Sequence, residues 1–506
     1  MSKRLDLLLI NPGSRTETYQ NLGDDLAAIE PPVWAGLMAS YALKKGLSVE
    51  ILDASAEALT PEQTARRVRE VDPVLAAVVV YGQQPSASTQ NMPSAGAACA
   101  AIKSHAPEQK VLLLGGHVAS LPERTLREES ADFVCGGEGL ATLVGLVAAL
   151  KAGGSSLGKV PDLYYREGPG VRSNPAAPLV RDIDAEIPGV PWHMLPMDRY
   201  RAHNWHCFDG LKRRPYASFY TTLGCPYRCS FCCIQAPFRS GEKAAGFTDA
   251  QNSYRFWDPK TVVGWIDDLV ARHGVRNIKF ADELFVLNPR HVDAVCDLII
   301  ERGYDLNIWA YARVDTVRDG MIEKLKAAGV NWLAFGIEAA NAKVREDVRK
   351  GFEQSDIART IKRVQAADIN VVGNYIFGLP EDDLASMRET LDMALALNCE
   401  FVNFYSAMAY PGSPLYSQAV KEGWALPERW SGHSQHAYDT LPLPTRTLSS
   451  SDVLRFRDHA FQVYYNDPRY LEMVARKFGA KTAEHVREMA KSPLRRKFLG
   501  HAPAGR

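Results

Sequence analysis

The chain has 506 residues, with 59 Lys and Arg balanced by 59 Asp and Glu, and this zero net charge provides no overall field for nucleic acid or an anionic membrane. No apolar stretch approaches the roughly 18 residues of a membrane span. Its nine cysteines, five of them scattered singly, do not form a disulfide framework, so we expect a reducing, cytoplasmic location.

The first part of the chain alternates short apolar runs with helical patterns. The five runs begin at Leu5, Val49, Leu75, Lys110 and Ala131. This alternation is typical of a parallel sheet with crossover helices, so we expect a doubly wound, Rossmann-like domain over residues 1–155. Its ligand would lie beyond the carboxyl ends of the strands, where glycines either admit a large ligand or only make tight turns.

Residues 156–210 are rich in Gly, Pro and Ser and are predicted to connect two domains, with a candidate hairpin in DLYYRE and GVRS. A second α/β series follows over residues 211–430. Its six expected strands are YASFYTTLG, IKFADE, NIWAYARVD, WLAFGIEAA, INVVGNYIFG and FVNFYSAMAY. Six strands with helices outside them predict a partial (β/α)6 barrel with its chemistry at the carboxyl ends of the strands. Residues 431–506 are predicted to be helical.

Four cysteines lie close together in LGCPYRCSFCCIQAPFR, just after the first strand of this series. Cys225, Cys229 and Cys232 are spaced as C-x3-C-x2-C. No neighbouring Cys or His completes a zinc knuckle, and a redox pair would leave Cys225 unexplained. Three thiolates on one loop fit a [4Fe-4S] cluster that leaves one iron without a protein ligand. The alternative is a structural cluster with a remote fourth ligand such as Cys207, and Cys233 is expected to be a packed neighbour.

The motif C-x3-C-x2-C, with Phe231 before its last cysteine, resembles the signature of the radical S-adenosylmethionine (SAM) superfamily. FADE, YARVD, FGIEAAN and GNYIFGLPED are similar to later motifs of that superfamily, although Ala339 stands where Ser is common. The resemblance implies SAM contacts at Asp282, Glu283, Arg313 and Glu338. A single carboxylate at a strand end could equally well form a structural salt bridge. The occurrence of all these motifs in the family's order, at predicted strand ends, favours SAM contacts.

The domain before the cysteines is similar to that of the cobalamin-binding radical SAM subfamily, through GGHVASLPE and GGEG. The resemblance implies cobalamin contacts at Gly115, Gly116, His117, Gly137, Glu138 and Gln83. The sequence has no D-x-H-x-x-G motif, so no histidine is expected to ligate cobalt. The alternative is a domain that has lost its corrinoid.

The resemblance implies an enzyme that cleaves SAM to a 5′-deoxyadenosyl radical and modifies an unactivated centre of a small molecule by cobalamin-dependent methyl transfer. It also implies an electron donor of the flavodoxin or ferredoxin type. One alternative is oxidative cyclisation or rearrangement, since PPVWAG and FADE also resemble the anaerobic magnesium-protoporphyrin cyclase group. Another is transfer of an aminocarboxypropyl group by an enzyme whose N-terminal domain holds no corrinoid. A non-catalytic alternative is a metal-stabilised binding module.

Overall fold

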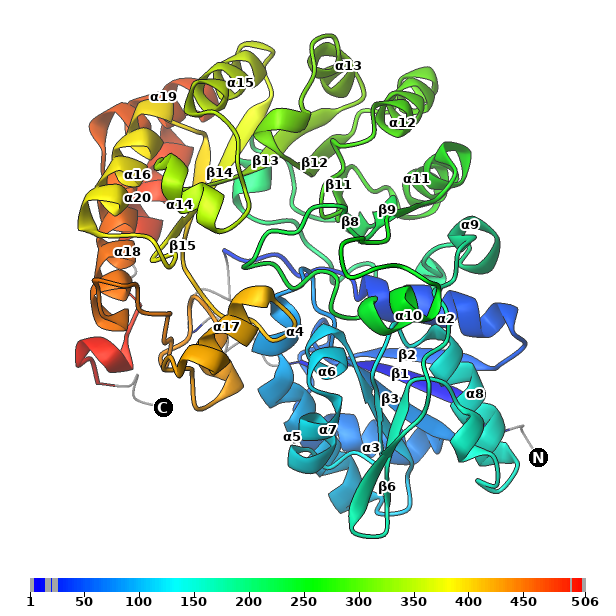
Figure 1. Cartoon of the computed structure of the whole chain (residues 1–506). Helices are drawn as coiled ribbons and strands as arrows, with labels where there is room; N and C mark the ends of the chain where they lie inside the picture. The colour runs from blue at the N-terminus through cyan, green and yellow to red at the C-terminus, as the bar shows by residue number, and fades with distance from the viewer. Residues whose placement is uncertain (1–3, 14–19, 21–25, 492–493, 503–506) are drawn as a thin grey trace.

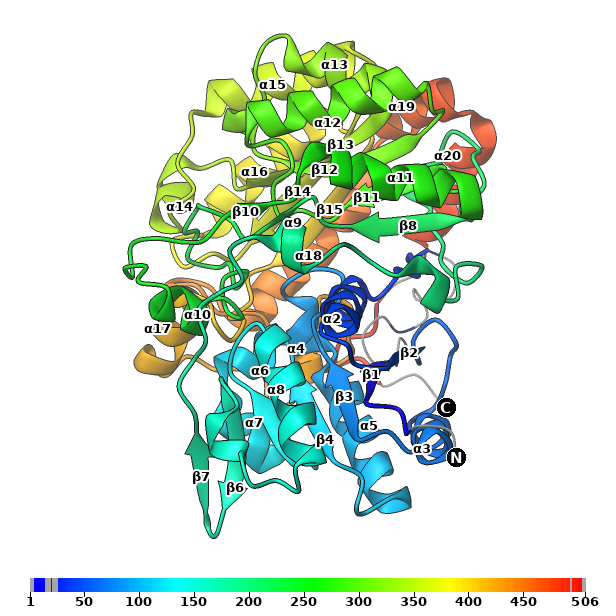
Figure 2. The ribbon, with the colours of Figure 1, turned by 90° about the vertical axis from the view of Figure 1, so that its right-hand side faces the viewer.

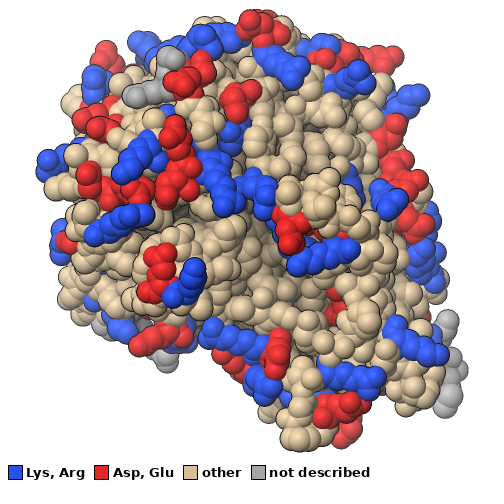
Figure 3. All heavy atoms as spheres, in the orientation of Figure 1, with Lys and Arg blue, Asp and Glu red and all other residues tan. Residues whose placement is uncertain are grey.

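The structure is a computed structural model that describes residues 4–13, 20, 26–491 and 494–502. Two α/β units lie against each other, one formed by the blue and cyan part of the chain and the other by the green to orange part (Figure 1). Basic and acidic side chains are interspersed over the face seen in Figure 3. No helix within the described ranges is both long and apolar enough to cross a bilayer.

The N-terminal sheet has the strand order β2-β1-β3-β4-β5-β6-β7. Its parallel strands are β1 (Leu7–Asn11), β2 (Val49–Asp53), β3 (Leu75–Val79), β4 (Val111–Leu114) and β5 (Phe133–Cys135). The chain order reverses between β1 and β3, which is the switch point where doubly wound sheets bind ligands. The antiparallel hairpin β6 (Leu163–Glu167) and β7 (Gly170–Ser173) extends this sheet, although its residues were expected in a connection between domains.

Helices cover both faces of the N-terminal sheet, because side chains of successive strand residues point to opposite faces. Leu7 and Leu9 of β1 share a core with α2 (Val33–Lys44) and α8 (Leu140–Lys151). Leu8 and Ile10 share a second core with α3 and α5. The other helices of this unit are α3 (Pro61–Val71), α4 (Ala87–Gln90), α5 (Met92–His105), α6 (Gly116–Ser120) and α7 (Pro122–Glu128).

The second sheet is parallel throughout, with the strand order β15-β14-β13-β12-β11-β8. Its strands are β8 (Tyr216–Phe219), β11 (Asn277–Phe280), β12 (Asn307–Ala312), β13 (Val330–Glu338), β14 (Asn370–Phe377) and β15 (Phe401–Ser406). The helices between them are α11 (Pro259–His273), α12 (Pro289–Arg302), α13 (Met321–Ala327), α14 (Ala342–Asp347), α15 (Gln354–Ala366) and α16 (Leu384–Leu397). In Figure 2, α11, α12 and α13 lie on the side of this sheet away from the N-terminal unit, as in a partial barrel.

Three C-terminal helices pack beside β14 and β15, and they are α18 (Ser450–Tyr465), α19 (Pro468–Phe478) and α20 (Ala480–Ala490). Ser449 caps the N-terminus of α18, and its hydroxyl accepts a hydrogen bond from the backbone N–H of Asp452 in a capping box. The remaining elements are α9 (Ile183–Glu186), β9 (Thr222–Leu223), α10 (Arg239–Ala244), β10 (Arg255–Phe256) and α17 (Pro414–Glu422). The predicted α/β class with a helical C-terminal segment is confirmed.

Two buried ion pairs join the two units. Glu138, which follows β5, pairs with Arg255 of β10 at 2.6 Å, and Glu30 pairs with Lys279 of β11 at 3.0 Å. All four side chains are less than a tenth exposed. The carboxyl ends of the N-terminal strands therefore face the interior of the second sheet.

Candidate active site between the two sheets

The cysteine loop leaves β9 and is held by side-chain amides. Cys225 N–H donates to Gln235 Oε1 at 3.1 Å. Asn252 Nδ2 donates to the carbonyl oxygens of Cys225 and Tyr227, at 2.9 and 2.7 Å. Gly224 precedes the first cysteine with a φ of 88°, a left-handed conformation that glycine adopts without strain. The loop therefore has a fixed backbone on which the thiols are displayed.

Cys225, Cys229 and Cys232 are partly exposed and free, whereas Cys233 is buried. All four line one cavity of about 300 Å³. Burial raises the pKa of Cys225 to about 12 and raises that of Cys232 further above its ordinary value. A bound cation would be needed to hold such thiols as thiolates, because metal coordination deprotonates a thiol outright.

The donor set fits a [4Fe-4S] cluster better than a single ion. Within the described residues, no three His, Cys, Asp or Glu side chains converge closely enough to hold one metal ion. A cubane cluster takes one thiolate per iron, so its ligands do not converge on a single atom. Three partly exposed thiols along one cavity wall suit that cluster.

The adjacent acids after β11 have different surroundings. Asp282 is fully buried, and its carboxylate accepts hydrogen bonds from Thr221 N–H, Thr221 Oγ1 and Thr222 Oγ1 at 2.6–3.0 Å. Glu283 lines the cysteine cavity, whereas Asp282 does not. Burial raises the pKa of Glu283 to about 8, an effect that nearby Lys279 opposes. Of the two acids expected to contact SAM, only Glu283 reaches the cavity.

Glu338 ends β13 in a left-handed conformation, with a φ of 64°. Such a conformation costs a residue other than glycine about 1–3 kcal/mol and is concentrated at functional sites. The pairing of β13 with β14 shifts register between Gly336 and Glu338, and the Glu338 carboxylate pairs with Lys350. Both side chains line the cysteine cavity, and a Cβ at Gly336 would overlap this pair.

Arg313 follows β12 and lies over the ring of Tyr227, with its guanidinium carbon 4.1 Å from the ring centroid. Its guanidinium pairs with Asp315 at 2.8 Å, and Nη1 lies 4.0 Å from Cys229 Sγ. The structure thus brings Glu283, Arg313 and Glu338 to the cavity of the three cysteines.

The expected cobalamin contacts separate into two groups. Gln83 lines the cysteine cavity, a second cavity at the switch point, and a third inside the barrel, and Gly116 lines a fourth, smaller cavity. The others are packed against protein. Gly115 approaches the Val80 backbone, the ring of buried His117 lies 3.1 Å from Thr89 Oγ1, Gly137 approaches Asp162 and Ser240, and Glu138 pairs with Arg255.

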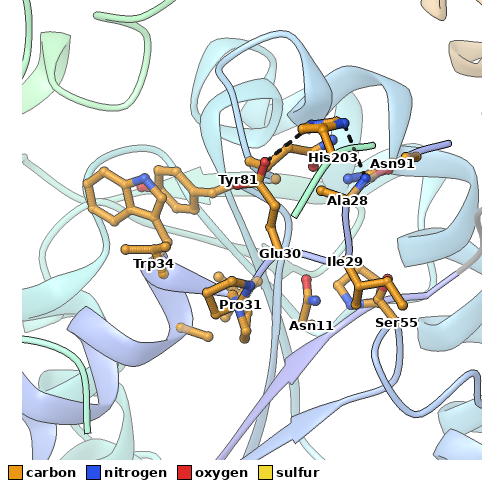
Figure 4. Close-up of a pocket in the computed structure, with 18 residues that line it drawn as sticks. Asn11, Ala28, Ile29, Glu30, Pro31, Trp34, Ser55, Tyr81, Asn91 and His203 are labelled. Carbon is orange, nitrogen blue, oxygen red and sulfur yellow. Dashed lines mark hydrogen bonds and ion pairs between the residues drawn. The ribbon is translucent and has the colours of Figure 1, made fainter. Parts of the chain in front are cut away.

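The cavity at the switch point lies beyond the ends of β1, β2 and β3 and has a volume of about 80 Å³ (Figure 4). Glu30 and His203 point toward each other there, with 3.7 Å between Oε1 and Nε2. Trp34 stacks on Tyr81, with ring centroids 4.2 Å apart. The neutral polar side chains that line this cavity include Asn11, Ser55 and Asn91. At about 80 Å³ the cavity has room for an amide side group of a corrin and not for the ring itself.

Several residues of the site were not predicted. Lys350 and the Glu30–Lys279 pair lie outside the cysteine motif and far from it along the chain. Tyr227 lies inside that motif, but its partner Arg313 is far along the chain. Asn11 and Ser55 were foreseeable as positions at strand ends, since both follow apolar runs of the first domain.

A family model described as the radical SAM superfamily matches residues 219–394, and one described as a B12 binding domain matches residues 21–147. An uncharacterized methyltransferase of Pyrococcus horikoshii is 27% identical over 475 residues, which cover 93% of this chain and 94% of the relative. The anaerobic magnesium-protoporphyrin IX monomethyl ester cyclase of Cereibacter sphaeroides is 28% identical over 412 residues, which cover 79% of this chain and 62% of the cyclase.

Two solved structures share the fold. The radical SAM methyltransferase TsrM of Kitasatospora setae, with cobalamin and a [4Fe-4S] cluster bound, has a TM-score of 0.61 at 18% identity, covering 83% of this chain and 75% of that one. The cobalamin-dependent radical SAM enzyme OxsB has a TM-score of 0.69 at 16% identity, covering 96% and 72%. At this level of identity the likeness concerns the fold alone.

Proposed function

The chain belongs to the cobalamin-binding radical SAM enzymes, and from this premise we propose that it transfers a methyl group to an unactivated centre of a small molecule. The family implies a [4Fe-4S] cluster, SAM and cobalamin as cofactors. Methyl transfer is favoured over cyclisation because the match to the methyltransferase relative covers 93% of this chain, whereas the match to the cyclase covers 79%.

The observation that carries the proposal is the shared lining of the cysteine cavity. Gln83 to Ser86, at the carboxyl end of β3, line the same cavity as Cys225, Cys229 and Cys232. A corrinoid beyond the N-terminal strands would therefore face the SAM site with no protein layer between them. Adjacent cofactors of this kind are what transfer of a methyl group to a substrate radical requires.

When bound, the cofactors supply the radical that abstracts hydrogen and the methyl group that replaces it. Cys225, Cys229 and Cys232 would hold the cluster. Glu283 would accept hydrogen bonds from the SAM ammonium group, and Arg313 would lie near the SAM carboxylate. Glu338, whose charge Lys350 balances, would contact bound SAM, and the cavity walls would exclude water from the reactive groups.

The test is to count cofactors and products in anaerobically purified protein. We expect about four irons per chain, stoichiometric cobalt, and formation of both 5′-deoxyadenosine and S-adenosylhomocysteine from SAM once a substrate is supplied. Stoichiometric zinc without SAM cleavage would contradict the enzyme assignment. 5′-Deoxyadenosine without S-adenosylhomocysteine would contradict methyl transfer, and iron without cobalt would identify a domain that does not hold a corrinoid.

A further inference from the structure

A large cavity of about 460 Å³ lies inside the barrel, on the side of the three C-terminal helices. Part of its wall is aromatic and includes Trp205, Trp309, Phe401 and Phe461, and amide and charged side chains line much of the rest. The ring of Trp205 packs edge-on against Trp309 at 5.3 Å and stacks on Phe401 at 5.6 Å. A rigid aromatic cavity of this size suits the apolar body of a small molecule.

This barrel cavity continues into the cysteine cavity. Tyr311, Asn374 and Tyr405 line both, as do Gln83 and Gln435. A molecule lying in the barrel cavity would therefore reach the proposed SAM site with one end. Its other end would lie toward α18, whose residues line the far wall.

At the α18 wall two buried arginines, Arg457 and Arg496, share a single carboxylate, that of Asp458, which leaves one positive charge in excess. Arg457 and Arg496 both pair with Asp458, through Oδ1 at 2.8 and 2.9 Å. All three nitrogens of Arg496 have hydrogen-bond partners: Nε and Nη2 donate to Asp458, and Nη1 donates to the carbonyl oxygens of Gln435 and Ala437 and to the hydroxyl of Thr440. A buried charge in excess of its partners is costly unless a ligand neutralises it.

Arg457 is the arginine of this group that lines the cavity, beside Asp458, whereas Arg496 does not line it. Its side chain is only 7% exposed. Nε donates to the carbonyl oxygen of Phe404 at 2.7 Å and Nη1 to Asp458 at 2.8 Å. Within the part of the chain that the structure describes, Nη2 has no hydrogen-bond partner. One excess charge with one open donor matches a monoanion better than a dianionic phosphate.

We propose that the barrel cavity binds a substrate with an apolar, ring-containing body and a carboxylate, and that Arg457 Nη2 binds this carboxylate. The group to be modified would then lie at the junction with the cysteine cavity, near Tyr311 and Tyr405. That the bound molecule is the substrate rests on the proposed function. The binding site itself follows from the cavity and its charges alone.

The test compares two probes of equal shape, 1-pyrenebutyrate and the uncharged 1-pyrenebutanol, titrated into the anaerobically purified full chain and followed by pyrene and tryptophan fluorescence. We expect the acid to bind about tenfold more tightly, since a hydrogen bond to a charged group contributes about 1.4 kcal/mol or more. Arg457→Gln should abolish this preference without weakening binding of the alcohol, and Arg457→Lys should retain part of it.

Arg455→Gln is the matched control. Arg455 lies on the same helix and lines the same cavity, but it is 65% exposed and pairs with Asp452, so its loss should leave the preference unchanged. Equal binding of the two probes to the unmutated protein would overturn the proposal. An Arg457→Gln variant that keeps the unfolding temperature of the unmutated protein and still prefers the acid would also overturn the proposal. Loss of bound cobalt in this variant would overturn it too, because it would assign Arg457 to the corrinoid.

The failure of this proposal is distinguishable from failure of the proposed function. Cys229→Ala should lose SAM cleavage and still prefer the acid, because Cys229 lies outside the barrel cavity. Absence of SAM cleavage with an intact, Arg457-dependent preference would contradict the proposed function and leave the binding site standing.

Discussion

The two neighbouring acids after β11 differ in what they do for the protein. Asp282 accepts three hydrogen bonds in full burial, whereas Glu283 faces the cavity. Asp282→Ala would remove the acceptor of these three buried hydrogen bonds, and we expect it to lower the free energy of unfolding by about 2 kcal/mol. Glu283→Gln should leave the unfolding midpoint of the metal-free chain near that of the unmutated protein at about pH 4.5, where the Glu283 carboxyl is protonated in the folded state, and weaken SAM binding at pH 7 about tenfold. Thermal unfolding and SAM titration are measured for both variants. A variant at Asp282 that weakens SAM binding without loss of stability, or one at Glu283 that loses stability without weaker SAM binding, would contradict these roles.

The raised pKa of Glu283 has a defined effect on stability. Its pKa is about 8 in the folded chain against 4.5 as the ordinary value. Between these values the folded state binds more protons than the unfolded state, so the contribution of Glu283 to stability falls as pH rises from about 4.5 to about 8. Metal-free Glu283→Gln should therefore lose less stability across this range than the unmutated metal-free chain. Urea unfolding at pH 5.5 and 7.5 measures the difference, and parallel losses in the two proteins would contradict it.

A buried ion pair between Glu138, which follows β5, and Arg255 of β10 joins the two units. Removing one partner of such a pair leaves the other charge buried, so Glu138→Gln should destabilise the chain by about 3 kcal/mol. The matched control is Glu123→Gln on α7, whose pair with Arg127 is 58% exposed on both sides and should contribute less than about 1 kcal/mol. Differential scanning calorimetry compares the two variants, and equal shifts in the first unfolding transition would contradict a special role for the Glu138–Arg255 pair.

Local sequence signals predicted most elements because each signal depends on neighbours in the chain. The apolar runs became buried parallel strands, and the predicted helical C-terminal segment contains α18, which Ser449 caps. The hairpin β6–β7 was placed correctly as a local feature, but its pairing with β5 depends on a distant strand. Motif spacing likewise placed both acids of FADE at a strand end, while the hydrogen bonds from Thr221 and Thr222 decide which one reaches the cavity.

The proposed cofactor and substrate sites all lie where the two sheets meet. The carboxyl ends of the N-terminal strands and of the barrel strands face one set of connected cavities, and Gln83 lines three of them. This arrangement puts the proposed corrinoid, SAM and substrate sites within one connected region. It also separates roles among the predicted residues, since Glu138 holds the two units together and Gln83 faces the cavities.

We propose that SAM binds an iron of a cluster held by Cys225, Cys229 and Cys232 of one loop. The most direct test is the electron paramagnetic resonance spectrum of the reduced, anaerobically purified protein before and after addition of SAM, together with 5′-deoxyadenosine formation. We expect a SAM-dependent change in the cluster signal and SAM cleavage in the unmutated protein and in the matched control Cys233→Ala, and loss of both in Cys225→Ala, Cys229→Ala and Cys232→Ala. A cluster signal that SAM leaves unchanged, or cleavage that survives Cys229→Ala, would contradict the claim.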